Sequence, residues 1–235
     1  MNQNKSENII QIFSLLIYKA KIGLTDKERD ILIREVHEQE SKSKNISYKK
    51  KISAWTGDTQ GFEFLYSNKK FQKLFNLIST NIRKYTEIIG LNNDKVNFYY
   101  QRAWATISRN SENIAPHEHQ QSHISFAYYL KKNKNDGTLN FYNKAAQNEI
   151  APGLFKSFYH STKDFFKTNY YNTNSVSFAP EVDEIYIFPS KSMHSTSQNK
   201  TNEERMSISA DVSIIAKDSE NTEFLQTPIK KWMKF

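Results

Sequence analysis

The sequence predicts an α+β fold that is mainly β, with its helices gathered in the first part of the chain. From Phe71 to Ile89 the apolar residues recur at steps of three and four, as on one face of a helix. From residue 97 onward they form short alternating or aromatic runs, which are typical of strands. The chain is also rich in aromatic residues (14%) and has only 6 glycines, which favours a packed interior over disorder.

The first apolar stretch, Ile9 to Tyr18, resembles the core of a signal peptide. It contains Gln11, lacks a small-residue cleavage site and is too short to span a bilayer. We therefore expect a buried strand there, no membrane association and a cytoplasmic protein.

Two helices are expected before the strands begin. Thr25 and Glu28 have the spacing of a capping box, which predicts a helix from this point to about Glu40. Apolar residues at steps of three and four from Phe71 to Ile89 predict a second, longer helix that ends at Gly90.

Eight short strands follow, and together they predict a double-stranded β-helix, that is, a jelly-roll or cupin-like core. We expect a single domain over 1–235, with a helical N-terminal support region (1–96), the jelly-roll core (97–215) and a C-terminal tail (216–235). The long aromatic gap 143–175 is expected to be a lid or a binding element. The predicted strands are Phe98–Ser108, Ile114–His119, Ile124–Leu130, Thr138–Tyr142, Val176–Ala179, Glu184–Phe188, Met193–Ser197 and Arg205–Ile215.

The amino-acid composition limits the kinds of catalytic and metal site that the chain can form. The absence of cysteine excludes disulfides, zinc–cysteine sites and thiol nucleophiles, so any metal must be held by His, Asp or Glu. The net charge is +8, but the lysines are scattered among Asn and Ser and form no arginine-rich stripe. A solvated basic surface is therefore favoured, and nucleic acid stays open only as the weaker alternative.

Three histidines form a candidate metal site. His117 and His119 are two residues apart in a predicted strand, so they project from the same face while Glu118 points away. His194 follows a buried strand late in the chain. Jelly-roll enzymes combine ligands from an early and a late strand in this way to leave open metal positions. Imidazole ligands at an oxygen-activating site favour Fe(II), with Zn, Ni and Co left open.

A candidate carboxylate anchor lies on the last strand. Arg205, Ser207 and Ser209 share one strand face, and an arginine fork with a serine hydroxyl two positions on suits a carboxylate ligand. The alternative is a surface arginine that pairs with Glu203 or Glu204.

Taken together, four segments resemble the 2-oxoglutarate/Fe(II)-dependent oxygenases of the prolyl-hydroxylase-like type, in an HxH…H…RxS variant. They read HEHQQSHISFAYYL, GTLNFY, EIYIFPSKSMH and ERMSIS. The resemblance implies that His117 and His194 are metal ligands and that Arg205 with Ser207 holds the distal carboxylate of 2-oxoglutarate. It also places Tyr129 against this co-substrate. The residues expected to line the pocket are Trp104, Ser125 and Ser209.

One position departs from the family pattern, because His119 stands where an Asp or Glu is usual. We favour a three-histidine centre, which would be one charge unit more positive than the usual one. On this interpretation His119→Asp should restore the usual ligand set. Two alternatives remain: His119 near the iron without binding it, or His119 as first ligand with Gln121 in the carboxylate position.

The function expected is that of a dioxygenase that uses Fe(II) and 2-oxoglutarate, hydroxylates an unknown small molecule or peptide, and releases succinate and CO2. The alternatives are a cupin-like three-histidine dioxygenase that does not use 2-oxoglutarate, and an inactive barrel that serves as a binding module. A nucleic-acid demethylase of the same superfamily is disfavoured, because Asp211 occupies the position where such enzymes usually carry a second arginine.

Overall fold

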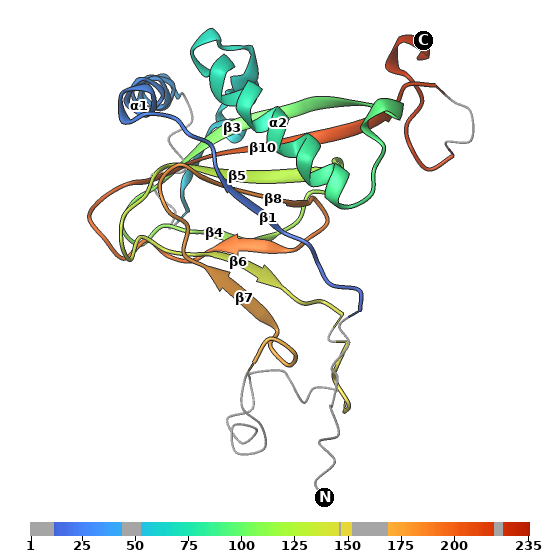
Figure 1. Ribbon diagram of the computed structural model, residues 1–235. Coiled ribbons are helices and arrows are strands. Elements are labelled where there is room, and N and C mark those ends of the chain that lie inside the picture. Colours follow the sequence, from blue (N-terminus) through green and yellow to red (C-terminus); the bar gives the residue numbers. More distant parts are fainter. Residues whose placement is uncertain (1–11, 44–52, 146, 152–168, 219–222) are drawn as a thin grey trace, which may run out of the picture.

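Two antiparallel sheets face each other in the computed structural model, which describes residues 12–43, 53–145, 147–151, 169–218 and 223–235 (Figure 1). The larger sheet has the order β1-β8-β5-β10-β3-β2 and the smaller sheet β4-β9-β6-β7. The chain therefore has the predicted mainly β double-stranded β-helix. Its strands are β1 (Tyr18–Lys21), β2 (Trp55–Thr56), β3 (Val96–Ser108), β4 (Ile114–His117), β5 (Ile124–Lys131), β6 (Leu139–Tyr142), β7 (Ser175–Phe178), β8 (Glu184–Pro189), β9 (His194–Thr196) and β10 (Arg205–Ala216).

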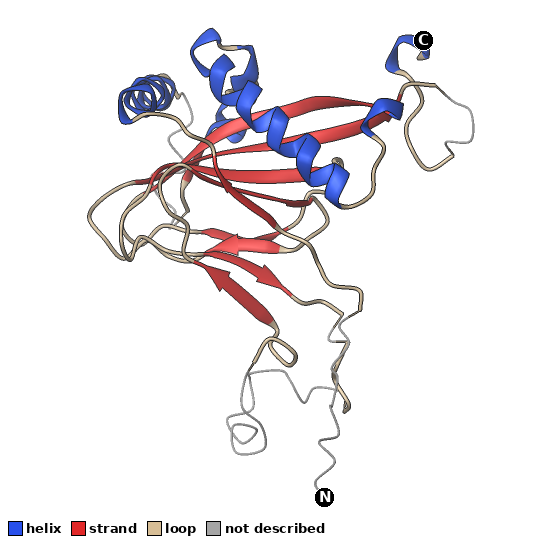
Figure 2. Ribbon diagram, in the orientation of Figure 1, coloured by secondary structure: helices blue, strands red, loops and turns tan. Residues whose placement is uncertain are grey.

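Helices α1 (Asp26–Ser41) and α2 (Gln72–Ile88) lie on the side of the larger sheet that faces away from the smaller one (Figure 2). The capping box of α1 is confirmed, because Thr25 accepts from the Glu28 amide and the Glu28 carboxylate accepts from the Thr25 amide. Helix α2 ends just before Gly90, which has a φ of +89°. The side chains that α2 buries repeat at helical spacing: Leu74, Phe75, Ile78, Ile82 and Tyr85.

Strand alternation divides the larger sheet into an apolar outer face and a more polar inner face. On β3, Ala103, Ala105 and Ile107 belong to the core under the helices, whereas Trp104 and Thr106 line the space between the sheets. The β3–β10 register continues this inner face, pairing Trp104 with Ser209, Thr106 with Ser207 and Ser108 with Arg205. The predicted Arg-x-Ser-x-Ser face therefore points between the sheets.

All eight predicted strands are confirmed within a few residues, but strand β4 ends at His117 and leaves His119 in the following loop. The predicted buried strand over Ile9–Tyr18 is wrong where it can be seen. Residues 12–16 are exposed outside any strand, and the strand starts only at Tyr18. Pairing with β8 decides this register: Lys19 contacts Glu184 at 2.8 Å.

Parts of two expectations lie outside the described residues, namely 9–11 of the first apolar stretch and 146 and 152–168 of the aromatic gap. Among the helices that the structure describes, none has the length and apolar character needed to cross a bilayer.

Candidate metal centre

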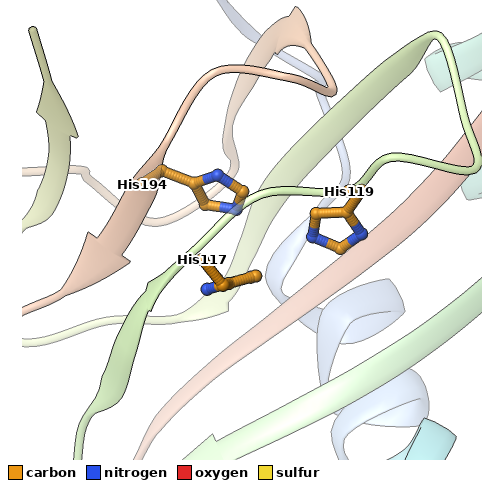
Figure 3. Close-up of side chains that lie close together, drawn as sticks. All are labelled: His117, His119 and His194. Atoms are coloured by element: carbon orange, nitrogen blue, oxygen red, sulfur yellow. The ribbon is translucent and has the colours of Figure 1, made fainter. Parts of the chain in front are cut away.

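The three histidines converge between the two sheets (Figure 3). His117 of β4 and His194 of β9 are direct partners in the strand register, and their ring centroids are 4.3 Å apart. His119 joins them from the loop after β4, where its amide donates to the Ser190 carbonyl at 3.0 Å. One ring nitrogen of each histidine lies within 4.8 Å of the others, so the cluster could hold a metal ion.

Each imidazole has its Nδ1 atom engaged by an acceptor that has no proton to give. His117 Nδ1 lies 2.8 Å from the Ala115 carbonyl oxygen, and His194 Nδ1 lies 2.8 Å from that of Ser192. His119 Nδ1 lies 2.7 Å from Oδ1 of Asp211. These contacts place the proton on Nδ1 and leave the lone pair of each Nε2 for a metal, the arrangement common among histidine ligands.

The surroundings also keep two of the imidazoles neutral. Burial lowers the pKa of His117. Burial, followed by the neighbouring His117, lowers the pKa of His194 to about 3. Because a metal needs the unprotonated ring nitrogen, both histidines are ready to bind at neutral pH. A set of three imidazoles suits a divalent ion of the Fe(II), Ni or Zn type better than Mg or Ca.

Asp211 of β10 is a residue of this site that the sequence interpretation missed. It is 0% exposed, and besides His119 it binds Arg102, Gln121 and Ser122. Burial raises the pKa of the Asp211 carboxyl, but hydrogen bonds from His119 and Arg102 outweigh burial and hold it below its ordinary value. The residue is therefore a carboxylate. The period of two that links Arg205, Ser207 and Ser209 also includes position 211, so the signal was present in the sequence.

Two neighbours of the histidines in this segment also border the cavity described next. The Gln121 side-chain nitrogen donates to Asp211 at 3.0 Å, and the shifted ligand set stays an alternative. Glu118, expected to point away, pairs with Lys144 and is outside the histidine cluster.

A cavity of about 290 Å³ extends from the histidines into the space between the sheets. Trp104 forms one wall beside the metal site, with its ring stacked on His119 at 5.8 Å. The structure thus brings all the predicted site residues to one cavity. Those that line it are Trp104, His117, His119, Ser125, Tyr129, His194, Arg205, Ser207 and Ser209.

Arg205 lies in the same cavity and is 3% exposed. Its Nη atoms donate four hydrogen bonds, all to neutral acceptors: the carbonyls of Asp136 and Ser197 and the hydroxyls of Ser108 and Thr196. Burial lowers the pKa of the guanidinium, yet arginine stays charged in proteins.

No carboxylate among the described residues lies within ion-pair distance of Arg205, so the alternative of a surface pair with Glu203 or Glu204 is wrong. Glu204 pairs instead with Arg109 at 2.8 Å and with His37 at 3.1 Å. A buried cation without a partner charge is costly unless an anion joins it. This end of the cavity therefore suits a carboxylate ligand.

The fold and the site together describe a double-stranded β-helix protein with three imidazoles and a buried arginine around one cavity. Comparison with known proteins shows which family its core resembles. Residues 102–211 match the model of a family described as "Putative 2OG-Fe(II) oxygenase". This match covers the barrel core of the chain, and the resemblance of its sequence motifs to this family, which uses Fe(II) and 2-oxoglutarate, is confirmed.

Solved structures share the fold at low sequence identity. A Pseudomonas putida prolyl-4-hydroxylase has a TM-score of 0.52 and 10% identity, with 84% of this chain and 92% of that chain covered. HygX from Streptomyces hygroscopicus, with nickel and 2-oxoglutarate bound, has a TM-score of 0.52 and 9% identity over 85% and 83% of the two chains. The α-ketoglutarate-dependent epimerase SnoN from nogalamycin biosynthesis has a TM-score of 0.54 and 12% identity over 84% and 78%. No curated protein sequence matches the chain.

Proposed function

We propose that this protein is a 2-oxoglutarate-dependent dioxygenase that hydroxylates a small molecule or a peptide and releases succinate and CO2. In this proposal His117, His119 and His194 bind Fe(II) through their Nε2 atoms. The observation that carries it is the single cavity that joins these three imidazoles to the buried, unpaired charge of Arg205. One end suits a metal and the other a carboxylate, as a keto diacid requires.

The chain's own contribution is binding and orientation, while Fe(II) with 2-oxoglutarate supplies the oxidising chemistry. Arg205 would hold the distal carboxylate of 2-oxoglutarate, with Ser207 beside it on the same strand face. Burial raises the pKa of Tyr129, against the opposing field of Arg205, so its phenol stays protonated and can donate to the same carboxylate. Arg205 and Tyr129 are only 3% and 1% exposed, so bulk water has little access to this end of the cavity.

Two features weigh against the other candidate functions. A cupin-like dioxygenase without 2-oxoglutarate has no need for a buried arginine that lacks a carboxylate partner, whereas the present cavity has one. A nucleic-acid demethylase of the second-arginine type would need a cation at position 211, where a buried carboxylate binds His119 instead. Thr56, Asp58 and Arg102 line the same cavity and are the side chains we expect to contact the primary substrate.

The proposal is tested by measuring succinate formed from 2-oxoglutarate under air, in the presence and absence of Fe(II). We expect slow, iron-dependent succinate release even without a primary substrate, and faster release when extracts that contain the substrate are added. Calorimetric titration of 2-oxoglutarate into the Mn(II)-loaded protein supplies a readout that does not depend on turnover. A protein that binds the metal but neither binds nor consumes 2-oxoglutarate would contradict the proposal in favour of the cupin-like alternative.

A further inference from the structure

His119 and Asp211 form a pair at the position of the site where a carboxylate ligand is usual. Iron(II) oxygenases typically bind their metal through two histidines and one carboxylate. Here the third position offers an imidazole, and a carboxylate lies directly behind it, with Asp211 Oδ1 2.7 Å from His119 Nδ1. We propose that His119 and Asp211 together replace the missing carboxylate ligand. Asp211 acts as the positioning residue that orients His119 Nε2 toward the metal. It also supplies the negative charge from behind the imidazole instead of from a ligand atom. This inference rests on the proposed metal centre.

Asp211 cannot easily take the ligand role itself, because both of its oxygen atoms are held. Oδ1 accepts from Ser122 at 3.2 Å in addition to its contact with His119. Oδ2 accepts from Arg102 at 2.5 and 3.0 Å and from Gln121 at 3.0 Å. Strand β10 fixes the Asp211 backbone between Arg102 of β3 and Ser125 of β5. Turning the carboxylate toward a metal would break these contacts, so its influence must pass through the imidazole.

The charges around Asp211 leave one negative charge for the metal centre. Arg102 pairs with Asp211, but its Nη1 atom also lies 3.6 Å from Asp58 Oδ2, so two carboxylates share one guanidinium. The Arg102 side chain is 36% exposed, and water screens it, whereas the Asp211 side chain is 0% exposed. A carboxylate behind a histidine ligand fixes its tautomer and raises its basicity toward the metal.

This arrangement changes what the substitution His119→Asp should do. From the sequence alone the change appeared to restore the usual ligand set. In the structure, an aspartate at position 119 would face the buried carboxylate of Asp211, which would have lost its imidazole donor, and two such carboxylates repel each other. We therefore expect His119→Asp to weaken metal binding, and Asp211→Asn in the same chain to relieve the repulsion and recover affinity.

The test is an anaerobic Co(II) titration of the full chain, which gives a dissociation constant and a visible spectrum without any turnover. The four proteins are the wild type, Asp211→Asn, His119→Asp and the double variant. Asp211→Asn should lower the affinity about ten- to a hundredfold and shift the Co(II) absorption bands, the effect typical of losing a partner behind a histidine ligand. The double variant should bind Co(II) at least about tenfold more tightly than His119→Asp, since one of two like charges is gone.

Glu118→Gln is the matched control, because it removes a negative charge at the edge of the same cavity, where Glu118 pairs with Lys144 and not with Arg102 or Asp211. The Co(II) affinity of this variant should change by less than about threefold. If Asp211→Asn does not fold, Gln121→Ala serves instead: it frees one side of the Asp211 carboxylate and should weaken Co(II) binding several-fold. The inference is wrong if Asp211→Asn, or Gln121→Ala in its place, binds Co(II) like the wild type, or if the double variant gains nothing over His119→Asp. A wild-type protein that binds no Co(II) or Fe(II) would overturn the proposed metal centre as well, which separates the two failures.

Discussion

Arg205 is the residue whose surroundings say most about the co-substrate, because its charge is buried among neutral acceptors. Arg205→Ala should remove a charge-assisted contact worth about 2–4 kcal/mol, so the affinity for 2-oxoglutarate should fall about thirtyfold or more. Metal affinity should change little. Calorimetric titration of Mn(II) into the metal-free protein, and of 2-oxoglutarate into the Mn(II)-loaded protein, measures the two affinities. Arg83→Ala, whose side chain stacks on Phe98 outside this cavity, is the matched control. If Arg205→Ala and the wild type bind 2-oxoglutarate with equal affinity, Arg205 does not bind the co-substrate.

Gly137 is the residue that makes room for this arginine. Its φ of +106° disfavours any side chain, and a Cβ atom there would collide with Arg205 Nη1 and the Ser197 carbonyl. We expect Gly137→Ala to cost about 1–3 kcal/mol of stability through the strained backbone. It should also weaken 2-oxoglutarate binding through the displaced guanidinium. Gly90→Ala has a similar φ and open space around it, so it should lose stability without losing 2-oxoglutarate affinity.

Local sequence patterns predicted most of the site residues, but not the contact between His119 and Asp211. The period of two grouped Arg205, Ser207 and Ser209 correctly, since faces of a strand follow from local geometry. The same rule placed His119 beside His117, and the two do meet, but through a loop that the Ser190 carbonyl holds rather than through strand alternation. The contact between His119 and Asp211 joins distant segments, and no local pattern encodes it.

At the scale of elements, Asp183 ties the start of α1 to the larger sheet. Its carboxylate accepts from the amides of Gly23 and Leu24 and from the Tyr128 hydroxyl. Asp183→Ala would leave these three donors without their acceptor, and its φ of +69° suits Asp or Asn better than Ala. We expect a loss of about 2–4 kcal/mol in urea unfolding. Asp183→Asn keeps one acceptor oxygen and should lose clearly less free energy of unfolding than Asp183→Ala. An equal loss in the two variants would show that the charge of Asp183, and not its hydrogen bonds, stabilises the fold.

The elements differ in how far the sequence determines them. Helix α2 and the eight core strands carry strong periodic patterns, and they were predicted nearly to the residue. Strand β1 was misplaced because apolar content suggested Ile9–Tyr18, whereas pairing with β8 selects Tyr18–Lys21, including the contact of Lys19 with Glu184. The two-residue strand β2 was missed altogether, since it exists only through its pairing with β3.

At the scale of the whole molecule, the site is built from both sheets, so the fold does not depend on the metal to form. Fe(II) or Co(II) should nevertheless raise the melting temperature, because a ligand that binds only the native state stabilises it. His194→Ala should stay folded but lose this stabilisation, which thermal denaturation with and without metal will show. His123→Ala is the control, since His123 lies outside the cluster although burial lowers its pKa too. A metal-induced shift of equal size in His194→Ala and the wild type would show that the metal binds elsewhere.

The central claim is that one cavity binds Fe(II) and 2-oxoglutarate together. The most direct test is an anaerobic titration of 2-oxoglutarate into the Fe(II)-loaded protein, followed by visible absorption. We predict a weak metal-to-ligand charge-transfer band that grows with 2-oxoglutarate and saturates in the wild type, and that is absent in His194→Ala. A wild-type protein that holds one Fe(II) and shows no such band at saturating 2-oxoglutarate would contradict the claim.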